Sequence, residues 1–140
     1  MMGDMANPPT YPQPREDATN APLIAGWREG RLMLQRCGDC RRAFFYPRPM
    51  CPHCWSEKLA WFEASGRGRI VAYSHVFKPH HPAFDAEAPI VLIEAALEEG
   101  ALMLTRVVGE DRTNARSRMA ISLVPMPEAA RYPLPTFVLA

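Results

Sequence analysis

The sequence of 140 residues predicts a mainly β protein, in which a short N-terminal helix and a rubredoxin-like zinc ribbon precede a five-stranded OB-fold barrel. Two observations predict this order. All four cysteines lie in two Cys-x-x-Cys pairs within residues 37–54. From residue 59 onward, strand-like segments follow one another without a long helical pattern between them. A chain of this length has room for one ordinary domain, or for one small module packed against another.

Residues 1–18 are expected to form a flexible tail, or a segment that orders only on a partner. They contain Pro8, Pro9, Pro12 and Pro14 among polar and charged residues. Such a segment buries too little apolar surface to offset the entropy lost on ordering it.

A short helix is expected over residues 20–29. Asn20 can act as its N-cap, Pro22 suits its first turn, and Gly30 can end it. One face carries three apolar side chains: Leu23, Ile24 and Trp27. A helix this short is marginal alone, so we expect this face to dock on the zinc ribbon of the same chain or on a partner protein.

The cysteine pairs have the spacing of a tetrahedral metal site, with ligands Cys37, Cys40, Cys51 and Cys54. A gap of two residues lets a tight turn direct two sulfurs to one point. Residues 32–36 are expected as a strand leading into the first turn and residues 43–46 as its return. Four thiolates leave no open coordination position, so we expect a structural Zn²⁺ that replaces the core a small module cannot build.

Other interpretations of the cysteines differ in what they require. Iron in the same four-sulfur site stays an alternative, because tetrahedral sulfur suits both metals. Disulfides would require an oxidising compartment, but the first thirty residues contain no apolar segment typical of a secretory signal. A redox dithiol would explain one pair and not the second. His53 is expected to be an exposed turn residue, since the cysteines complete the ligand set.

The second half of the sequence is expected to form the barrel. Its predicted strands are residues 59–63, 69–77, 89–97, 101–108, 119–125 and 135–139, each rich in β-branched, aromatic or large aliphatic residues. Glu98-Glu99-Gly100 is short enough to close a hairpin, and Gly66-Arg67-Gly68 allows a sharp bend. We therefore expect helix and ribbon in residues 19–58 and a five-stranded antiparallel barrel in residues 59–140.

Composition argues against a membrane protein. The formal net charge is +1, and 48% of residues are apolar. The longest apolar stretch, residues 89–97, is interrupted by Glu94 and falls short of the about 20 residues that span a bilayer. We expect a cytoplasmic protein.

Catalytic residues are not recognisable. All four cysteines are committed to metal, and no nucleophile elbow, Walker loop or dinucleotide-binding glycine pattern occurs. A second metal site or a general base could be formed by His75, His80 and His81 with Asp85 and Glu87. Histidines next to prolines are more typical of a polar surface loop, and no nucleophile accompanies these. We expect no catalysis by this chain alone.

Several motifs resemble those of a known family. They are Gln35-Arg36-Cys37-x-x-Cys40, Phe45-Tyr46-Pro47-Arg48-Pro49 before Cys51-Pro52-x-Cys54, Trp61, Ser65-Gly66-Arg67-Gly68, the strand 70–77, the loop 80–84 and Leu134-Pro135-Thr136-Phe137. Over residues 20–140 the chain resembles the zinc-ribbon/OB-fold proteins long classified as a domain of unknown function (type 35) and associated with acyl-CoA metabolism. Similar proteins usually carry a glycine where this chain has Arg118.

The resemblance implies a non-catalytic accessory subunit of a thiolase-superfamily enzyme, such as a β-ketothiolase, an acyltransferase or an aldolase. The partner would supply the nucleophile, while this chain stabilises it and helps to enclose acyl-CoA. We expect a hetero-oligomer with two copies of this chain on a partner dimer. Exposed apolar residues usually mark such an interface, and the candidates are Leu23, Ile24, Trp27 and Phe45.

Arginines are concentrated in residues 28–48, a segment that contains six arginines and only two acidic residues. Arginine binds phosphate groups bidentately, and the candidates to contact the phosphates of coenzyme A are Arg36, Arg41, Arg42 and Arg48. A solvated face or the rim of a protein interface would explain these arginines equally well.

A nucleic-acid-binding module is the main alternative function, because arginines interleaved with aromatic residues can contact phosphates and stack on bases. Against it stand the net charge of +1 and the presence of only two lysines. An electron carrier with iron in the four-sulfur site is a third hypothesis, and the red colour of such a protein would identify it.

Overall fold

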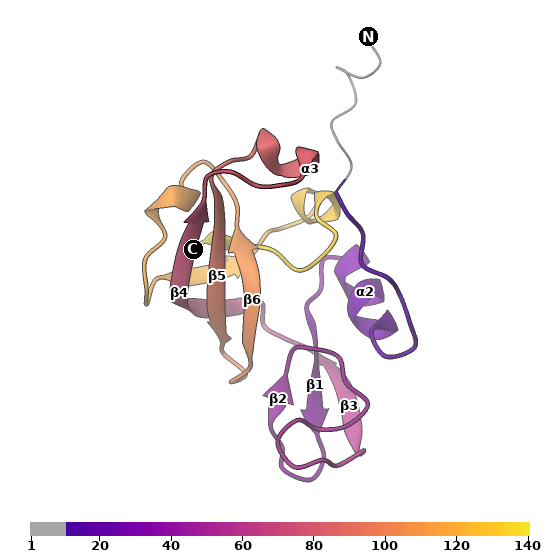
Figure 1. Ribbon diagram of the computed structural model, residues 1–140. Helices are drawn as coiled ribbons and strands as arrows, with labels where there is room; N and C mark the ends of the chain where they lie inside the picture. Colours follow the sequence, from indigo (N-terminus) through magenta and orange to yellow (C-terminus); the bar gives the residue numbers. More distant parts are fainter. Residues whose placement is uncertain (1–10) are drawn as a thin grey trace.

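The computed structural model describes residues 11–140, in which an N-terminal helix and a small sheet are followed by a closed barrel (Figure 1). Helix α2 spans Ala21–Arg28, and the small sheet contains β1 (Met33–Cys37), β2 (Ala43–Phe44) and β3 (Leu59–Glu63). The barrel contains β4 (Arg67–Val76), β5 (Ile90–Leu97), β6 (Leu102–Val107), β7 (Ala120–Leu123) and β8 (Phe137–Leu139). Three short helices connect the strands: α3 (Pro82–Asp85), η1 (Arg112–Asn114) and η2 (Glu128–Arg131). Within this part of the chain, no helix has the length and apolar character needed to cross a bilayer.

Helix α2 lies where the sequence predicts it, but the side-chain cap expected from Asn20 does not form. The side chain of Asn20 makes no capping bond to the helix. Just before the helix, the carboxylate of Asp17 accepts hydrogen bonds from the N–H groups of Thr19 and Asn20, both at 2.9 Å. Gly30 ends the helix with a φ of 78°, and its N–H donates to the carbonyl of Trp27. This left-handed conformation explains why a glycine follows the helix.

The small sheet has the strand order β2-β1-β3, with both neighbours antiparallel to β1. Gln35 is paired with Phe44 on one side and with Trp61 on the other. The prediction that residues 59–63 belong to the barrel is wrong, because they form β3 of the ribbon sheet. Alternating apolar residues predict a strand but do not specify the sheet in which it pairs.

The barrel closes in the order β4-β5-β6-β8-β7, which confirms the predicted five-stranded OB fold. Its neighbouring strands are antiparallel except β6 and β8, which are parallel at Val107 and Phe137. The first residues of β4 pair with both β5 and β7. At Gly68 an added Cβ would lie 2.5 Å from the carbonyl oxygen of Ala96, so the bend at the start of β4 requires glycine. The Glu98-Glu99-Gly100 turn joins β5 to β6 as expected.

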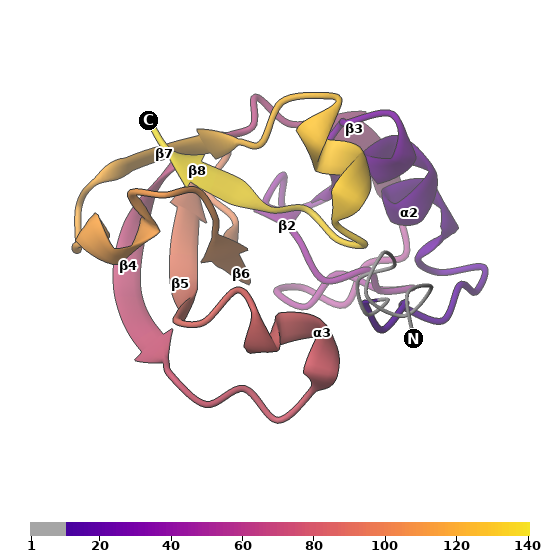
Figure 2. The same cartoon turned by 90° about the horizontal axis from the view of Figure 1, so that it is seen from above.

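The ribbon and the barrel share one hydrophobic core. Its main cluster joins residues of the N-terminal half, such as Leu32 and Leu34, to barrel residues such as Met103 and Phe137. A second cluster packs α2 against the C-terminal part of the chain through Trp27, Val108, Val124, Ala129 and Tyr132. Figure 2 shows α2 beside the yellow helix η2. The two modules are therefore packed against each other and are not simply joined by a linker.

The expected N-terminal tail is only partly covered by the structure, because residues 1–10 lie outside the described part. In residues 11–18, Tyr11 is packed against the rest of the chain. Its ring stacks on Phe84 with centroids 5.3 Å apart and on Tyr132 with centroids 6.0 Å apart. Aromatic contacts of this kind supply the apolar burial that the local sequence lacks.

Candidate metal centre and apolar groove

Two turns of equivalent geometry carry the cysteines. In the first, the N–H of Arg41 donates to the carbonyl of Cys37, and in the second the N–H of Trp55 donates to the carbonyl of Cys51. The residue after each second cysteine has a positive φ, 66° at Arg41 and 68° at Trp55. Each turn thereby closes tightly and directs both of its sulfurs to the same side.

The four sulfurs converge, with all of them within 4.8 Å of one another. The Sγ atoms of Cys37 and Cys54 are 3.5 Å apart, and those of Cys40 and Cys51 are 3.6 Å apart. A tetrahedral site with Zn–S bonds of about 2.3 Å requires sulfurs about 3.8 Å apart, so this donor set fits Zn²⁺. A disulfide would need about 2.05 Å between the sulfurs, and all four cysteines are free.

Backbone amides surround the sulfurs. The N–H groups of Asp39 and Cys40 donate to the sulfur of Cys37, each at 3.4 Å, and lower the pKa of that thiol to about 6. The N–H of Ser56 favours the thiolate of Cys54, but the hydrogen bonds with the Cys37, Cys40 and Cys51 thiols together with burial outweigh it, and the pKa of Cys54 is raised to about 12. A bound Zn²⁺ would hold all four sulfurs as thiolates.

Two of the candidate arginines make contacts within the ribbon. The Arg36 guanidinium lies 4.5 Å from the centroid of the Phe62 ring and donates to the carbonyl of Arg41. The Arg42 side chain contacts Nδ1 of His53 at 3.4 Å. His53 is exposed, as are Arg36, Arg41, Arg42 and Arg48. These side chains line the outer surface of the ribbon.

The candidate interface residues are buried within the chain itself. Their exposed fractions are 4% at Leu23, 7% at Ile24, 3% at Trp27 and 8% at Phe45. The expectation that the helix and ribbon leave this apolar surface uncovered was therefore wrong, because the barrel and η2 cover it. On the ribbon turns, by contrast, Trp55 is 76% exposed and Met50 is 38% exposed.

The histidine loop forms no cluster of metal ligands in the described residues, where the four cysteines are the one such group. Nδ1 of His81 accepts a hydrogen bond from the N–H of Ala83 and caps α3. His75 lies between the rings of Tyr73 and Phe77. His80 and Asp85 are exposed.

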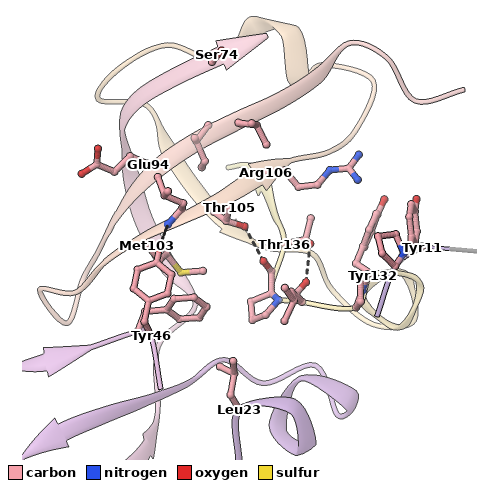
Figure 3. Close-up of a pocket in the computed structure, with 18 of the residues that line it drawn as sticks. Tyr11, Leu23, Tyr46, Ser74, Glu94, Met103, Thr105, Arg106, Tyr132 and Thr136 are labelled. Carbon is pink, nitrogen blue, oxygen red and sulfur yellow. Dashed lines mark hydrogen bonds between the residues drawn. The ribbon is translucent and has the colours of Figure 1, made fainter. Parts of the chain in front are cut away.

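An apolar groove of about 750 Å³ separates the outer face of β4, β5 and β6 from the ribbon (Figure 3). The floor consists of barrel residues that include Ala72, Leu92, Glu94 and Leu104. Phe45, Tyr46 and Leu23 form the side toward the ribbon and helix, and Leu134-Pro135-Thr136 forms another side. The Tyr46 hydroxyl accepts a hydrogen bond from the N–H of Leu104 at 2.9 Å and ties the ribbon to the barrel.

A network of charged and aromatic side chains closes one end of the groove. The Arg106 guanidinium donates to the Glu87 carboxylate at 2.8 Å, and the Tyr11 hydroxyl donates to the same carboxylate. Arg106 also lies between the rings of Phe84 and Tyr132, 5.6 and 5.5 Å from their centroids. Burial of Glu87 opposes its ionisation, but the hydrogen bonds from Tyr11 and Arg106 outweigh burial and lower its pKa. Burial and the hydrogen bond to Glu87 raise the pKa of Tyr11.

The sequence does not predict the groove or this network. It predicts Tyr11 to lie in a tail, contains no motif that includes Arg106, and indicates Glu87 only as a neighbour of the candidate histidines. Tyr11 and Glu87 are 76 residues apart, and Arg106 is 19 residues from Glu87. The one local signal was a charged residue, Arg106, at the end of an apolar strand.

Comparisons of the sequence with protein families identify two consecutive domains. Residues 25–60 match the family described as "ChsH2, rubredoxin-like zinc ribbon domain", and residues 61–124 match "ChsH2, C-terminal OB-fold domain". Among solved structures, the chain is similar to one titled "Ltp2-ChsH2(DUF35) aldolase". The two chains are 32% identical with a TM-score of 0.75, and the match covers 91% of this chain and 98% of that chain.

Further relatives share part of the sequence or the fold. A probable enoyl-CoA hydratase alpha subunit from Thermomonospora curvata is 36% identical over 98 residues, which cover 70% of this chain and 30% of that protein. A DUF35 domain-containing scaffold protein from Methanothermobacter thermautotrophicus is 38% identical over 81 residues, 57% of this chain and 60% of that protein. The chain therefore spans less than two thirds of either relative. A DUF35 protein of unknown function from Sulfolobus solfataricus is 13% identical, with a TM-score of 0.64 over 88% of this chain and 86% of its own, and shares the fold.

Proposed function

We infer that this chain, which belongs to the ChsH2/DUF35 family of zinc-ribbon and OB-fold proteins, is a non-catalytic scaffold subunit of a thiolase-superfamily enzyme that acts on acyl-CoA. The observation that carries the proposal is the similarity, over nearly the whole of both chains, to the ChsH2 part of an aldolase assembly. The relatives named as scaffold proteins support the same role.

The chemistry of the chain is compatible with a scaffold. Its cysteine site offers four closed ligands and no open position at which a substrate could bind a metal. His81, one of the candidate histidines, caps helix α3 through its Nδ1 atom. A partner would therefore supply the nucleophile and the general base.

The proposed docking surface is the tip of the zinc ribbon. Trp55 and Met50 are exposed there, and the side chains of Arg41 and Arg42 on the first metal turn are exposed as well. Tryptophan and arginine are enriched among the residues that contribute most to binding at protein interfaces. The earlier candidates α2 and Phe45 would act indirectly, because they hold the ribbon in place against the barrel.

Acyl-CoA would be bound at the junction of this chain and its partner. The candidates to contact its phosphates are Arg36, Arg41, Arg42 and Arg48, whose guanidinium groups are exposed on the ribbon. If these arginines line the entrance for acyl-CoA, Arg42→Glu raises the apparent KM for the thioester and leaves zinc content unchanged.

The test is coexpression of the chain with the thiolase-superfamily subunits encoded in the same genome, followed by size-exclusion chromatography and titration of the separated components. We expect a stable complex with two copies of this chain on a partner dimer, and acyl-CoA turnover that requires the partner.

A matched pair of variants tests the docking surface. Trp55→Ala should weaken the complex by about 30-fold, the equivalent of about 2 kcal/mol for an interface residue of this kind. Phe77→Ala, which removes a ring that is 68% exposed on the barrel, should leave the affinity unchanged. Copurification of nucleic acid with no thiolase-superfamily complex would overturn the proposed function, and an effect of Phe77→Ala alone would move the docking surface to the barrel.

A further inference from the structure

The groove between barrel and ribbon has the size of a small-molecule site. Its volume of about 750 Å³ lies within the range of about 300–1,000 Å³ that is typical of ligand pockets. Most of its lining consists of aliphatic and aromatic side chains, among them Leu23, Phe45, Leu92, Ile93 and Met103. Ligand pockets share this apolar character.

The walls of the groove are fixed before any ligand arrives. Leu23, Phe45, Ile93 and Met103 all belong to the main core cluster and are nearly fully buried. On the C-terminal side, the Thr105 hydroxyl donates to the carbonyl of Pro135 at 2.8 Å. A site with fixed walls loses little conformational entropy when it binds.

The groove has a closed end. Tyr11, Phe84 and Tyr132 stack there, and Figure 3 shows Tyr11 and Tyr132 together beyond Arg106. Tyr46, Met103 and Glu94 lie toward the other end. This shape favours an elongated molecule that enters beside the ribbon and ends at the aromatic stack.

The charges of the groove select against an anion. The positive charge of Arg106 is paired with Glu87 at 2.8 Å, and the ion pair is largely buried, with 14% and 18% of the two side chains exposed. Arg131 also approaches Glu87, at 3.9 Å, but it does not line the groove. Glu94 adds a carboxylate to the wall. Within residues 11–140, no ion pair includes Glu94, so an incoming carboxylate or phosphate would meet uncompensated negative charge. The exposed arginines of the ribbon do not line the groove.

From size, shape and charge together, we propose that this groove is a binding site for an elongated, uncharged apolar chain. The scaffold then holds a small apolar ligand by itself, in addition to its partner. The binding energy comes from burying apolar surface of the ligand against the barrel face, at about 25 cal/mol per Å². Anionic head groups remain outside the groove.

The proposal is tested on the full zinc-loaded chain with the neutral fluorescent probe N-phenyl-1-naphthylamine. We expect saturable binding at one site with increased fluorescence. Dodecanol should displace the probe, and dodecanoate, which is ionised at about pH 8, should need at least about tenfold higher concentration. Absence of saturable binding would overturn the proposal and leave the groove for a protein partner. Equal displacement by dodecanoate would overturn the selection against anions.

Two neighbouring residues of β4 offer a matched control. Ala72 and Val71 are both exposed, but only Ala72 lines the groove. Ala72→Trp should obstruct the floor and weaken probe binding by at least about tenfold, whereas Val71→Trp should leave it within about twofold. Both variants should keep the zinc content and the circular dichroism spectrum of the parent chain. Equal probe affinity of the two variants would place the probe elsewhere and overturn the assignment.

Discussion

At the scale of single residues, Arg118 is a non-glycine residue in a backbone conformation that favours glycine. Its φ of 76° lies in the left-handed region, where the resemblance predicts a glycine. The contacts of this residue are made by its main chain: the N–H donates to the carbonyl of Ile70 at 2.7 Å, and its carbonyl accepts from Arg69 at 3.0 Å. The side chain itself is exposed. The turn keeps its geometry at the cost of strain in a non-glycine residue.

We expect Arg118→Gly to stabilise the chain by about 0.5–1 kcal/mol, because relief of the left-handed strain exceeds the entropy that glycine adds to the unfolded state. Urea unfolding measures the effect. Arg118→Ala is the control, since it removes the charge and keeps the Cβ. A glycine variant no more stable than the alanine variant would show that the turn is unstrained.

The second prediction at this scale concerns pH. Because the pKa of Glu87 is lowered in the folded chain, its ionised form favours folding. This contribution is complete above the ordinary glutamate pKa of about 4.3 and is lost as the pH falls from there through the lower pKa of the folded state.

Glu87→Gln should therefore destabilise the chain at neutral pH, by about 1–3 kcal/mol for the loss of hydrogen bonds to a charged group. The difference in unfolding free energy between parent and variant should shrink at acidic pH. Urea titrations from neutral to acidic pH test this, with Glu110→Gln as a control at an exposed residue. A difference that does not change with pH would contradict the assignment.

The same residues mark the limit of prediction from sequence. The four cysteines were recognised because each turn is local and its spacing alone brings two sulfurs together. The sequence does not indicate the network of Glu87, Arg106 and Tyr11, because the contacts of these residues depend on how β6, the α3 loop and the N-terminal segment meet in space. Side chains whose partners lie far along the chain leave no periodic or spacing signal.

At the scale of elements, we expect the ribbon to depend on a bound metal. Sheet β2-β1-β3 is small, and Cys37, Phe44 and Cys51 form a separate cluster around the metal turns. Metal binding would supply folding free energy that this cluster does not.

Cys51→Ser should abolish stoichiometric zinc binding and unfold the ribbon more than the barrel. Elemental analysis gives the metal content, and hydrogen exchange gives the protection of β1 and β5 separately. We expect β1 amides to lose protection first. Ser56→Ala, which changes a neighbouring side chain outside the ligand set, is the control. Unchanged zinc content and stability in Cys51→Ser would refute the four-cysteine site.

The sequence predicts the strands of the barrel, but it does not predict the strand with which residues 59–63 pair. The segments 89–97 and 101–108 lie on either side of a short turn, so their pairing as β5 and β6 follows from the sequence. Residues 59–63 are equally strand-like, but they pair with β1 only because the two cysteine turns between these strands reverse the direction of the chain. The burial of α2 is likewise not evident from the sequence, since the residues that cover Trp27 lie far along the chain and include Val108, Val124, Ala129 and Tyr132.

At the scale of the whole molecule, Trp27 joins the N-terminal helix to the C-terminal part of the chain. Its ring is 3% exposed, and its Nε1–H donates to the carbonyl of Tyr132 at 2.8 Å. The sequence analysis expected Trp27 to contact a partner directly, but this position makes it a core residue.

Trp27→Ala should lower the free energy of unfolding by about 3–5 kcal/mol, the usual cost of removing a buried tryptophan. Trp27→Phe keeps most of the ring volume and loses the hydrogen bond, so it should be much less destabilising. Thermal unfolding of both variants without a partner measures this. If Trp27→Ala were as stable as the parent chain, the second core cluster would contribute nothing to folding.

The contact between Trp27 and Tyr132 also has a consequence during protein synthesis. The two residues are 105 positions apart, so the ribosome completes the helix and the metal turns long before it makes the segment that covers them. Until then, the apolar face of α2 is exposed on the nascent chain and can associate with other apolar surfaces. Contacts of such long sequence separation also slow folding. Early binding of zinc by the two turns would order one part of the nascent chain before the last barrel strand is synthesised.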